Sequence, residues 1–170
     1  MNEIREIVTK AVVGKGKKKF TINERVKPVN KAFSVLGCWI INNEFKAVKS
    51  GKNVEVIGTF EINIWYSHEN NAKTDVTKKV ITYTNSIPTA QVVQDTLDSE
   101  EEVIVRMLQQ PTCVDAKLSD DFIDVEIIYE ALAEVIGETK MKVTVFNPTD
   151  QYVEEDEFDI DINENFINEI

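Results

Sequence analysis

Cysteine and histidine are scarce in this sequence. Its 170 residues include two cysteines, Cys38 and Cys113, and one histidine, His68. Two cysteines are too few for a disulfide-built scaffold, and these two lack the paired spacing of a zinc site. We therefore expect two reduced, half-buried thiols. His68 follows a strand pattern in a polar stretch, where a solvated loop residue is expected rather than a general base.

Long apolar runs are also missing. The longest uncharged apolar stretch, residues 35–41, is far shorter than the roughly 20 residues that cross a bilayer. We therefore expect no direct membrane insertion. Residues 1–6 lack the basic start, apolar middle and small-residue cleavage site of a secretory signal. The protein is expected to remain in the compartment that made it.

Basic residues are absent from the last part of the chain. The net charge is −11, and no Lys or Arg follows Lys142, whereas nine acids do. The first 31 residues show the opposite balance, with nine basic and three acidic residues. The chain therefore has a basic head and an acidic tail.

The body of the chain alternates between apolar and polar residues with a period of two. Residues 54–67 predict a long β-strand, and residues 73–84 predict the strand that returns beside it as a hairpin. Gly58 interrupts the apolar face and indicates a bulge or a close approach of another chain segment. Residues 123–136 predict a third long strand. Gly137-Glu138 suits a two-residue turn into a strand over 139–146.

Shorter segments complete the expected fold. Strands are predicted at 34–41, 103–108 and 112–118, the last two separated by Gln109-Gln110-Pro111, and residues 85–101 are expected to form a loop or one short helical turn. Residues 4–13 fit a short helix leading into a strand, although several are β-branched. The expected fold is an all-β, antiparallel, sandwich-like domain of about seven or eight strands with an N-terminal helix or strand extension. We assign residues 1–147 to this β-rich assembly domain with its basic N-terminal segment, and 148–170 to an acidic C-terminal tail.

Groups that carry chemistry are few. We expect no catalytic residue, no cofactor and no metal, because no catalytic, metal or nucleotide motif is intact. A Cys–His pair joining His68 to either cysteine is the one arrangement that would favour an enzyme. Nucleic acid is not an expected partner, because the chain is strongly acidic and Phe20 is the single aromatic residue near the basic cluster.

The strands contain four aromatic residues that the pattern assigns by default to the core: Trp39, Phe60, Trp65 and Tyr66. Trp65 alone occupies the polar register of its strand. It is therefore the aromatic residue expected to be exposed or to lie in an interface.

Five blocks in order resemble the spore coat protein E family, the outer-coat morphogenetic proteins of endospore-forming bacteria. They occupy residues 5–13, 36–42, 62–67, 107–111 and 133–140, and an acidic end follows them. The resemblance runs over almost the whole chain. The tail departs from the family's more purely acidic pattern, because Ile160, Ile162, Phe166 and Ile167 lie among its acids.

The resemblance implies a non-enzymatic, self-assembling scaffold of the outer spore coat. Family members assemble in the mother-cell cytoplasm at the forespore surface, oligomerise, depend on the basement-layer morphogenetic ATPase for localisation, and recruit outer coat proteins. The alternative from the residues alone is a monomeric ligand- or carbohydrate-binding β-sandwich that uses Trp65.

Charge suggests how copies of the chain would be oriented. The candidate oligomerisation residues are Lys15, Lys17, Lys18, Lys19 and Trp65. The candidate partner-docking tail comprises Glu154, Glu155, Asp156, Glu157, Asp159 and Asp161. A basic head and an acidic tail on one chain suit a head-to-tail contact that can propagate.

Overall fold

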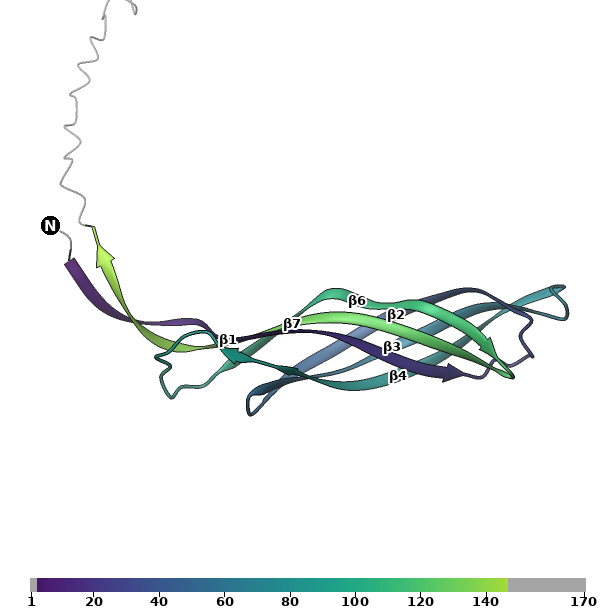
Figure 1. The fold of residues 1–170 in the computed structure, drawn as a ribbon, viewed down its shortest axis with the longest axis horizontal. Coiled ribbons are helices and arrows are strands. Elements are labelled where there is room, and N and C mark those ends of the chain that lie inside the picture. The colour runs from purple at the N-terminus through teal and green to yellow at the C-terminus, as the bar shows by residue number, and fades with distance from the viewer. Residues whose placement is uncertain (1–2, 147–170) are drawn as a thin grey trace, which may run out of the picture. The chain divides into compact units, whose positions relative to one another are not determined.

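The computed structural model describes residues 3–146, and they form strands joined by turns and loops, with no helix (Figure 1). The strands are β1 (Glu3–Val26), β2 (Ser34–Ser50), β3 (Asn53–His68), β4 (Lys73–Pro88), β5 (Ala90–Gln91), β6 (Glu102–Ser119) and β7 (Phe122–Val145). The predicted all-β fold is therefore confirmed. The acidic tail, predicted over 148–170, lies outside the described residues.

The strands form two sheets. One has the order β5-β1-β7-β6 and the other the order β2-β3-β4. Residues 7–141 make one compact unit. The described part of a second unit comprises residues 3–6, which begin β1, and residues 142–146, which are the last residues of β7 and Phe146 after it.

The three-stranded sheet follows the period-two pattern closely. β3 pairs antiparallel with β4 from Asn53↔Pro88 to His68↔Lys73, so the predicted hairpin is confirmed and is slightly longer than expected. β2 pairs with the other side of β3 and continues to Ser50, well beyond the predicted end. Gly51, at a φ of 59°, supplies the left-handed residue of the two-residue turn between β2 and β3.

The predicted hairpin at Gly137-Glu138 is wrong. β7 runs through Gly137 as one strand, and it pairs with β6 from Phe122↔Ser119 to Ile136↔Glu102. The turn lies instead at Asp120-Asp121, where Asp120 has a φ of 55°. A side chain at position 137 would lie about 3.2 Å from Val13, so this glycine permits close packing rather than a turn.

Two other predictions change in the four-stranded sheet. The helix alternative for residues 4–13 is wrong and the strand alternative is confirmed, because the β-branched residues there belong to β1. The two short strands predicted around Pro111 are one strand, β6, whose register shifts between Met107 and Thr112 and again near Cys113. Pro111 is tolerated because β6 is an edge strand with bulges.

The core of residues 7–141 lies between the inner faces of the two sheets. β3 contributes its alternate apolar residues, and β7 contributes the series from Ile123 to Val135. One aromatic contact crosses this layer, between Tyr83 of β4 and Tyr129 of β7, at a centroid separation of 5.2 Å. Within the sheets, Phe60 packs beside Tyr83 at 5.5 Å and Phe20 stacks on Tyr129 at 4.9 Å. Tyr83 donates a hydrogen bond to Asn43 and Tyr129 accepts one from Asn85, so both buried hydroxyls are satisfied.

Candidate assembly surface

The outer face of the β2-β3-β4 sheet carries exposed apolar residues in neighbouring register positions. Trp65 lies between Gly37 of β2 and Val76 of β4, and Ile41 and Val80 lie on either side of Glu61. Trp39 is paired with Asn63, in the row between the row of Trp65 and the row of Glu61. We call this surface the tryptophan face; its members are Trp39, Ile41, Trp65, Val76 and Val80, all exposed.

The two tryptophan rings form a stacked pair. Their centroids are 6.5 Å apart with an interplanar angle of 24°. The Trp39 ring also covers Gly37, since a side chain at that position would come within about 3.0 Å of it. Even so, 51% of Trp39 and 42% of Trp65 remain exposed. Such a rigid aromatic pair suits contact with another molecule at a small loss of side-chain entropy.

Polar groups occupy the middle of the tryptophan face. Asn63 donates a hydrogen bond of 2.8 Å to Glu61, and Lys78 lies 3.8 Å from the same carboxylate. Asn63 is itself almost fully buried beneath its neighbours. The tryptophan face therefore has apolar residues around polar groups that already bind one another. A partner can cover these polar groups without burying an unpaired charge.

The sequence predicted half of the aromatic pair. The exposure of Trp65 is confirmed, whereas the core assignment of Trp39 is wrong. Phe60 and Tyr66 are buried as expected. Trp39 was misplaced because residues 34–41 are apolar on both faces of β2, so alternation there carries no information about which face is buried.

The four lysines of the basic head all lie on β1, but their environments differ. Lys15 and Lys17 each lie 3.7 Å from a carboxylate of β7, Glu134 and Glu130 respectively. The ammonium of Lys18 sits 5.2 Å from the centre of the Phe20 ring. Within residues 3–146, Lys18 and Lys19 form no ion pair. The part of the basic cluster that remains available to another molecule is therefore Lys18 and Lys19.

The structure does not bring these lysines to the tryptophan face. Lys15 pairs with Ala90 in the four-stranded sheet, and the adjacent Gly16 is packed against the carbonyl of Pro88, the last residue of β4. Trp65 lies in the other sheet beside Val76, near the start of β4. The two candidate groups thus lie near opposite ends of this strand. The candidate acidic residues, Glu154 to Asp161, lie outside the described residues.

The expectation of a solvated His68 is wrong. Its side chain is buried, with 8% of the residue exposed, at the end of β3. It packs beside Tyr66 at a centroid distance of 6.0 Å and lies 4.0 Å from Glu69. Cys38 is paired with Ile64, four positions earlier on β3, about 13 Å along a strand. The structure therefore does not assemble a pair between His68 and Cys38.

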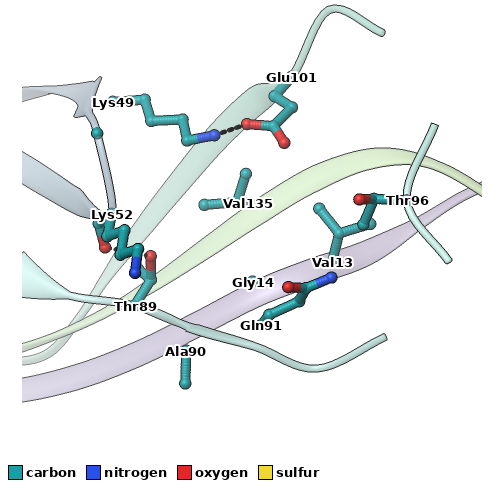
Figure 2. Close-up of a pocket in the computed structure, with 11 residues that line it drawn as sticks. Val13, Gly14, Lys49, Lys52, Thr89, Ala90, Gln91, Thr96, Glu101 and Val135 are labelled. Atoms are coloured by element: carbon teal, nitrogen blue, oxygen red, sulfur yellow. Dashed lines mark hydrogen bonds and ion pairs between the residues drawn. The ribbon is translucent and has the colours of Figure 1, made fainter. Parts of the chain in front are cut away.

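A cavity of about 390 Å³ lies between the turn after β2 and the β1, β5 and β7 region (Figure 2). Its carboxylate, Glu101, forms an ion pair with Lys49, as the dashed line in Figure 2 shows. Thr89 donates its hydroxyl hydrogen bond to the carbonyl of Lys52. These polar groups bind one another, and the Lys49–Glu101 pair connects the end of β2 to the segment just before β6 of the other sheet.

Residues 3–146 contain no group of three His, Cys, Asp or Glu side chains placed to hold a metal ion. The same part of the chain has no helix able to cross a membrane.

Comparison with known proteins identifies a family. A model of the family described as outer spore coat protein E (CotE) matches residues 3–170. Among the curated proteins and the solved structures, no match to the chain is found. The matched residues include both sheets and the tryptophan face. The match agrees with the resemblance of the five sequence blocks to this family. The chain therefore belongs to the outer spore coat protein E (CotE) family and is a structural protein of the spore coat.

Proposed function

We propose that this protein is a non-enzymatic, self-assembling morphogenetic scaffold of the outer spore coat. It oligomerises in the mother-cell cytoplasm at the forespore surface and recruits other coat proteins. The observation that carries the proposal is the tryptophan face, where exposed apolar residues surround a polar centre on the outside of a sheet. Exposed apolar residues that adjoin one another in this way are typical of protein–protein interfaces.

Unpaired strand edges supply a second means of association. β2 and β4 are the edges of one sheet, and β6 is an edge of the other. Each presents backbone N–H and C=O groups that a strand of another copy can pair with. Edge pairing would hold an array through directional hydrogen bonds, while the tryptophan face supplies apolar burial.

The proposed partners are those that the resemblance of the sequence blocks implies. We propose that the basement-layer morphogenetic ATPase localises the scaffold and that outer coat proteins dock on it. The acidic tail is the proposed docking segment, because its carboxylates can pair with basic surfaces at long range. Its role is independent of the tryptophan face, so the two functions can be separated by mutation.

The test of self-assembly is the double substitution Trp39→Ser and Trp65→Ser. Both side chains are substantially exposed, so the fold is expected to persist with an unchanged circular dichroism spectrum. Loss of two interface aromatic residues typically weakens association at least 30-fold, about 2 kcal/mol or more. Mass photometry of the wild type and the variant over a dilution series would measure this change.

A matched control is available on the other sheet. Ile104 and Leu108 of β6 are also large, exposed and apolar. Because edge pairing at β6 uses backbone groups rather than these side chains, the double substitution Ile104→Ser and Leu108→Ser is expected to leave particle formation within a factor of three of the wild type. If the tryptophan variant assembles as well as this control, the tryptophan face is not an assembly surface.

A carbohydrate-binding β-sandwich is the second candidate, and the stacked tryptophan pair favours it. Aromatic faces next to polar groups such as Asn63 and Glu61 suit the flat faces and hydroxyls of a sugar. This function predicts a monomer of 19.4 kDa whose tryptophan fluorescence changes on titration with coat or cortex polysaccharide. Large particles with unresponsive fluorescence would instead favour the scaffold.

A further inference from the structure

The two cysteines, far apart in the sequence, lie on the facing edge strands of the two sheets. Cys38 of β2 is paired with Ile64, and Cys113 of β6 is paired with Ile127. Both isoleucines are fully buried. Because directly paired residues of a sheet point to the same face, both thiols point into the layer between the sheets.

Contacts between β2 and β6 fix how these two strands lie relative to each other. Asn43 donates a 3.1 Å hydrogen bond to Gln110, and Lys49 forms an ion pair with Glu101. Later residues of β2 therefore lie beside earlier residues of β6, so the two strands run antiparallel. Extending this antiparallel alignment from Asn43 back along β2 brings Cys38 opposite Cys113, close enough for the two thiols to interact.

We propose that Cys38 and Cys113 form an oxidation site, at which a hydroperoxide converts the two thiols into a disulfide joining β2 to β6 within one chain. This proposal goes beyond the assembly function and does not depend on it. Both residues are partly buried beside the core, which a small oxidant can reach more easily than a protein oxidant can.

The reaction has two balanced steps. The sulfur of Cys113 attacks one oxygen of hydrogen peroxide, the O–O bond breaks, and the thiol proton leaves with the departing hydroxide as water. The sulfur of Cys38 then attacks the resulting sulfenic sulfur. The S–O bond breaks, and the hydroxyl leaves as water with the proton of Cys38. The two sulfurs lose two electrons in total, and the peroxide gains them.

The environment of Cys38 decides this order. Burial, and after it the interaction with the neighbouring Cys113 thiol, raises the pKa of Cys38 above its ordinary value. Cys38 therefore stays protonated at neutral pH and is the poorer first nucleophile. It is placed to resolve the sulfenic acid on its neighbour.

The disulfide would be a covalent cross-link between the two sheets. β2 and β6 belong to different sheets. A cross-link between them closes a long loop in the unfolded chain, which lowers the conformational entropy of that state. We expect the thermal midpoint of the oxidised protein to rise by roughly 5–15 °C over the reduced protein.

The experiment oxidises the reduced full-length chain with hydrogen peroxide and digests the product under non-reducing conditions. The expected result is a linked peptide pair holding Cys38 and Cys113, recovered from a gel band of single-chain mass. Dithiothreitol should reverse both the link and the rise in thermal midpoint. Links confined to bands of higher mass, or sulfinic acid without a link, would overturn the proposal.

The variants Cys38→Ser and Cys113→Ser supply the control. Each should show no rise in thermal midpoint on peroxide treatment, whatever its own starting stability. The Cys38→Ser variant should also accumulate sulfenic acid that a dimedone probe traps, because its resolving thiol is absent. A midpoint rise in either variant equal to that of the wild type would show that the stabilisation has another source.

Discussion

Gly58 lies directly across from Tyr83, and the ring of the tyrosine occupies the space that a side chain at position 58 would need. A Cβ there would lie about 2.5 Å from the Tyr83 hydroxyl and 2.7 Å from the carbonyl of Glu44. The interruption of the apolar pattern at Gly58 is therefore a close approach, one of the two alternatives that the sequence indicated. Tyr83 in turn packs against Phe60 and Tyr129, so this glycine positions the aromatic centre of the core.

Replacing Gly58 by alanine should lower the free energy of unfolding by about 1–3 kcal/mol, because the ring and the β2 backbone must both move. Urea unfolding of a dilute, non-assembled sample would measure it. Gly51→Asn is the control, since position 51 faces open space and asparagine tolerates its positive φ. Equal unfolding midpoints for Gly58→Ala and the wild type would contradict the packing argument.

The Arg25–Asp124 pair gives a prediction about pH. Arg25 binds both carboxylate oxygens of Asp124, at 2.7 and 3.1 Å, and holds the pKa of that carboxyl below its usual value. A folded-state pKa below the unfolded value contributes stability above about pH 4, and the contribution is lost as the pH falls through the folded pKa. Arg25→Met should therefore melt below the wild type at pH 6, and the difference should vanish towards pH 2.

Thermal melts at several pH values would measure this effect, which is small because both groups are exposed. Lys31→Met is a suitable control, because Lys31 lies 3.8 Å from Asp121 without the two-point geometry of Arg25. A deficit of Arg25→Met that stays constant from pH 6 to pH 2 would show that the arginine acts through packing, for example on Phe122, rather than through its charge.

At the scale of strands, the sequence is informative where one face of a strand is apolar and the other polar. β3 and β4 have such alternation, and both the pairing and the exposure of Trp65 could be predicted from it. In β7 the alternation continues through Gly137, but the turn propensity of Gly-Glu suggested a hairpin. Glycine is needed at position 137 because Val13 packs against it, and no pattern within β7 reveals this contact.

The rest of the candidate site depends on contacts between strands distant in sequence. Trp39 is exposed although β2 is apolar on both faces. The meeting of Cys38 with Cys113 depends on how the edge strands of the two sheets face each other. Neither follows from the period of one strand, because each is set by tertiary packing.

The tryptophan face predicts how β4 should respond to added charge. Val76 and Val80 are exposed on β4, so Val76→Lys and Val80→Lys together should leave the fold intact. Burying two ammonium groups in an apolar contact is costly, and particle formation should fall at least tenfold by mass photometry. Thr82→Lys adds a charge on the same face of the same strand beyond the tryptophan face, and it should have a much smaller effect. Equal losses in the two variants would indicate a general effect of charge.

The distribution of ion pairs over the molecule indicates which lysines of the basic head could take part in a head-to-tail contact. Lys15 and Lys17 are engaged by Glu134 and Glu130, whereas Lys18 and Lys19 have no ion pair in the described residues. If a basic head orients neighbouring copies, Lys18 and Lys19 are the residues to change. Reversing Lys15 or Lys17 would instead place like charges side by side within the four-stranded sheet.

The variant Lys18→Glu with Lys19→Glu should assemble several-fold more slowly at 0.1 M salt. This difference should shrink at 1 M salt, where the Debye length falls from about 10 Å to about 3 Å. Adding Glu154→Lys and Glu155→Lys to the same chain should partly restore the rate, measured by light scattering. If the fourfold variant is no faster than the lysine variant, the acidic tail is not the partner of the basic head, and recruitment or solubility becomes its role.

The pairing of β1 with β7 has a consequence for how the chain is synthesised. The three-stranded sheet is built from consecutive strands and can form while the ribosome is still extending the chain, whereas β1 is made early and its partner β7 last. Until then, β1 is a long nascent strand with its hydrogen-bonding groups open to other nascent chains. The run of charges from Lys15 to Lys19 lies in its middle and can act as a gatekeeper against premature cross-chain pairing.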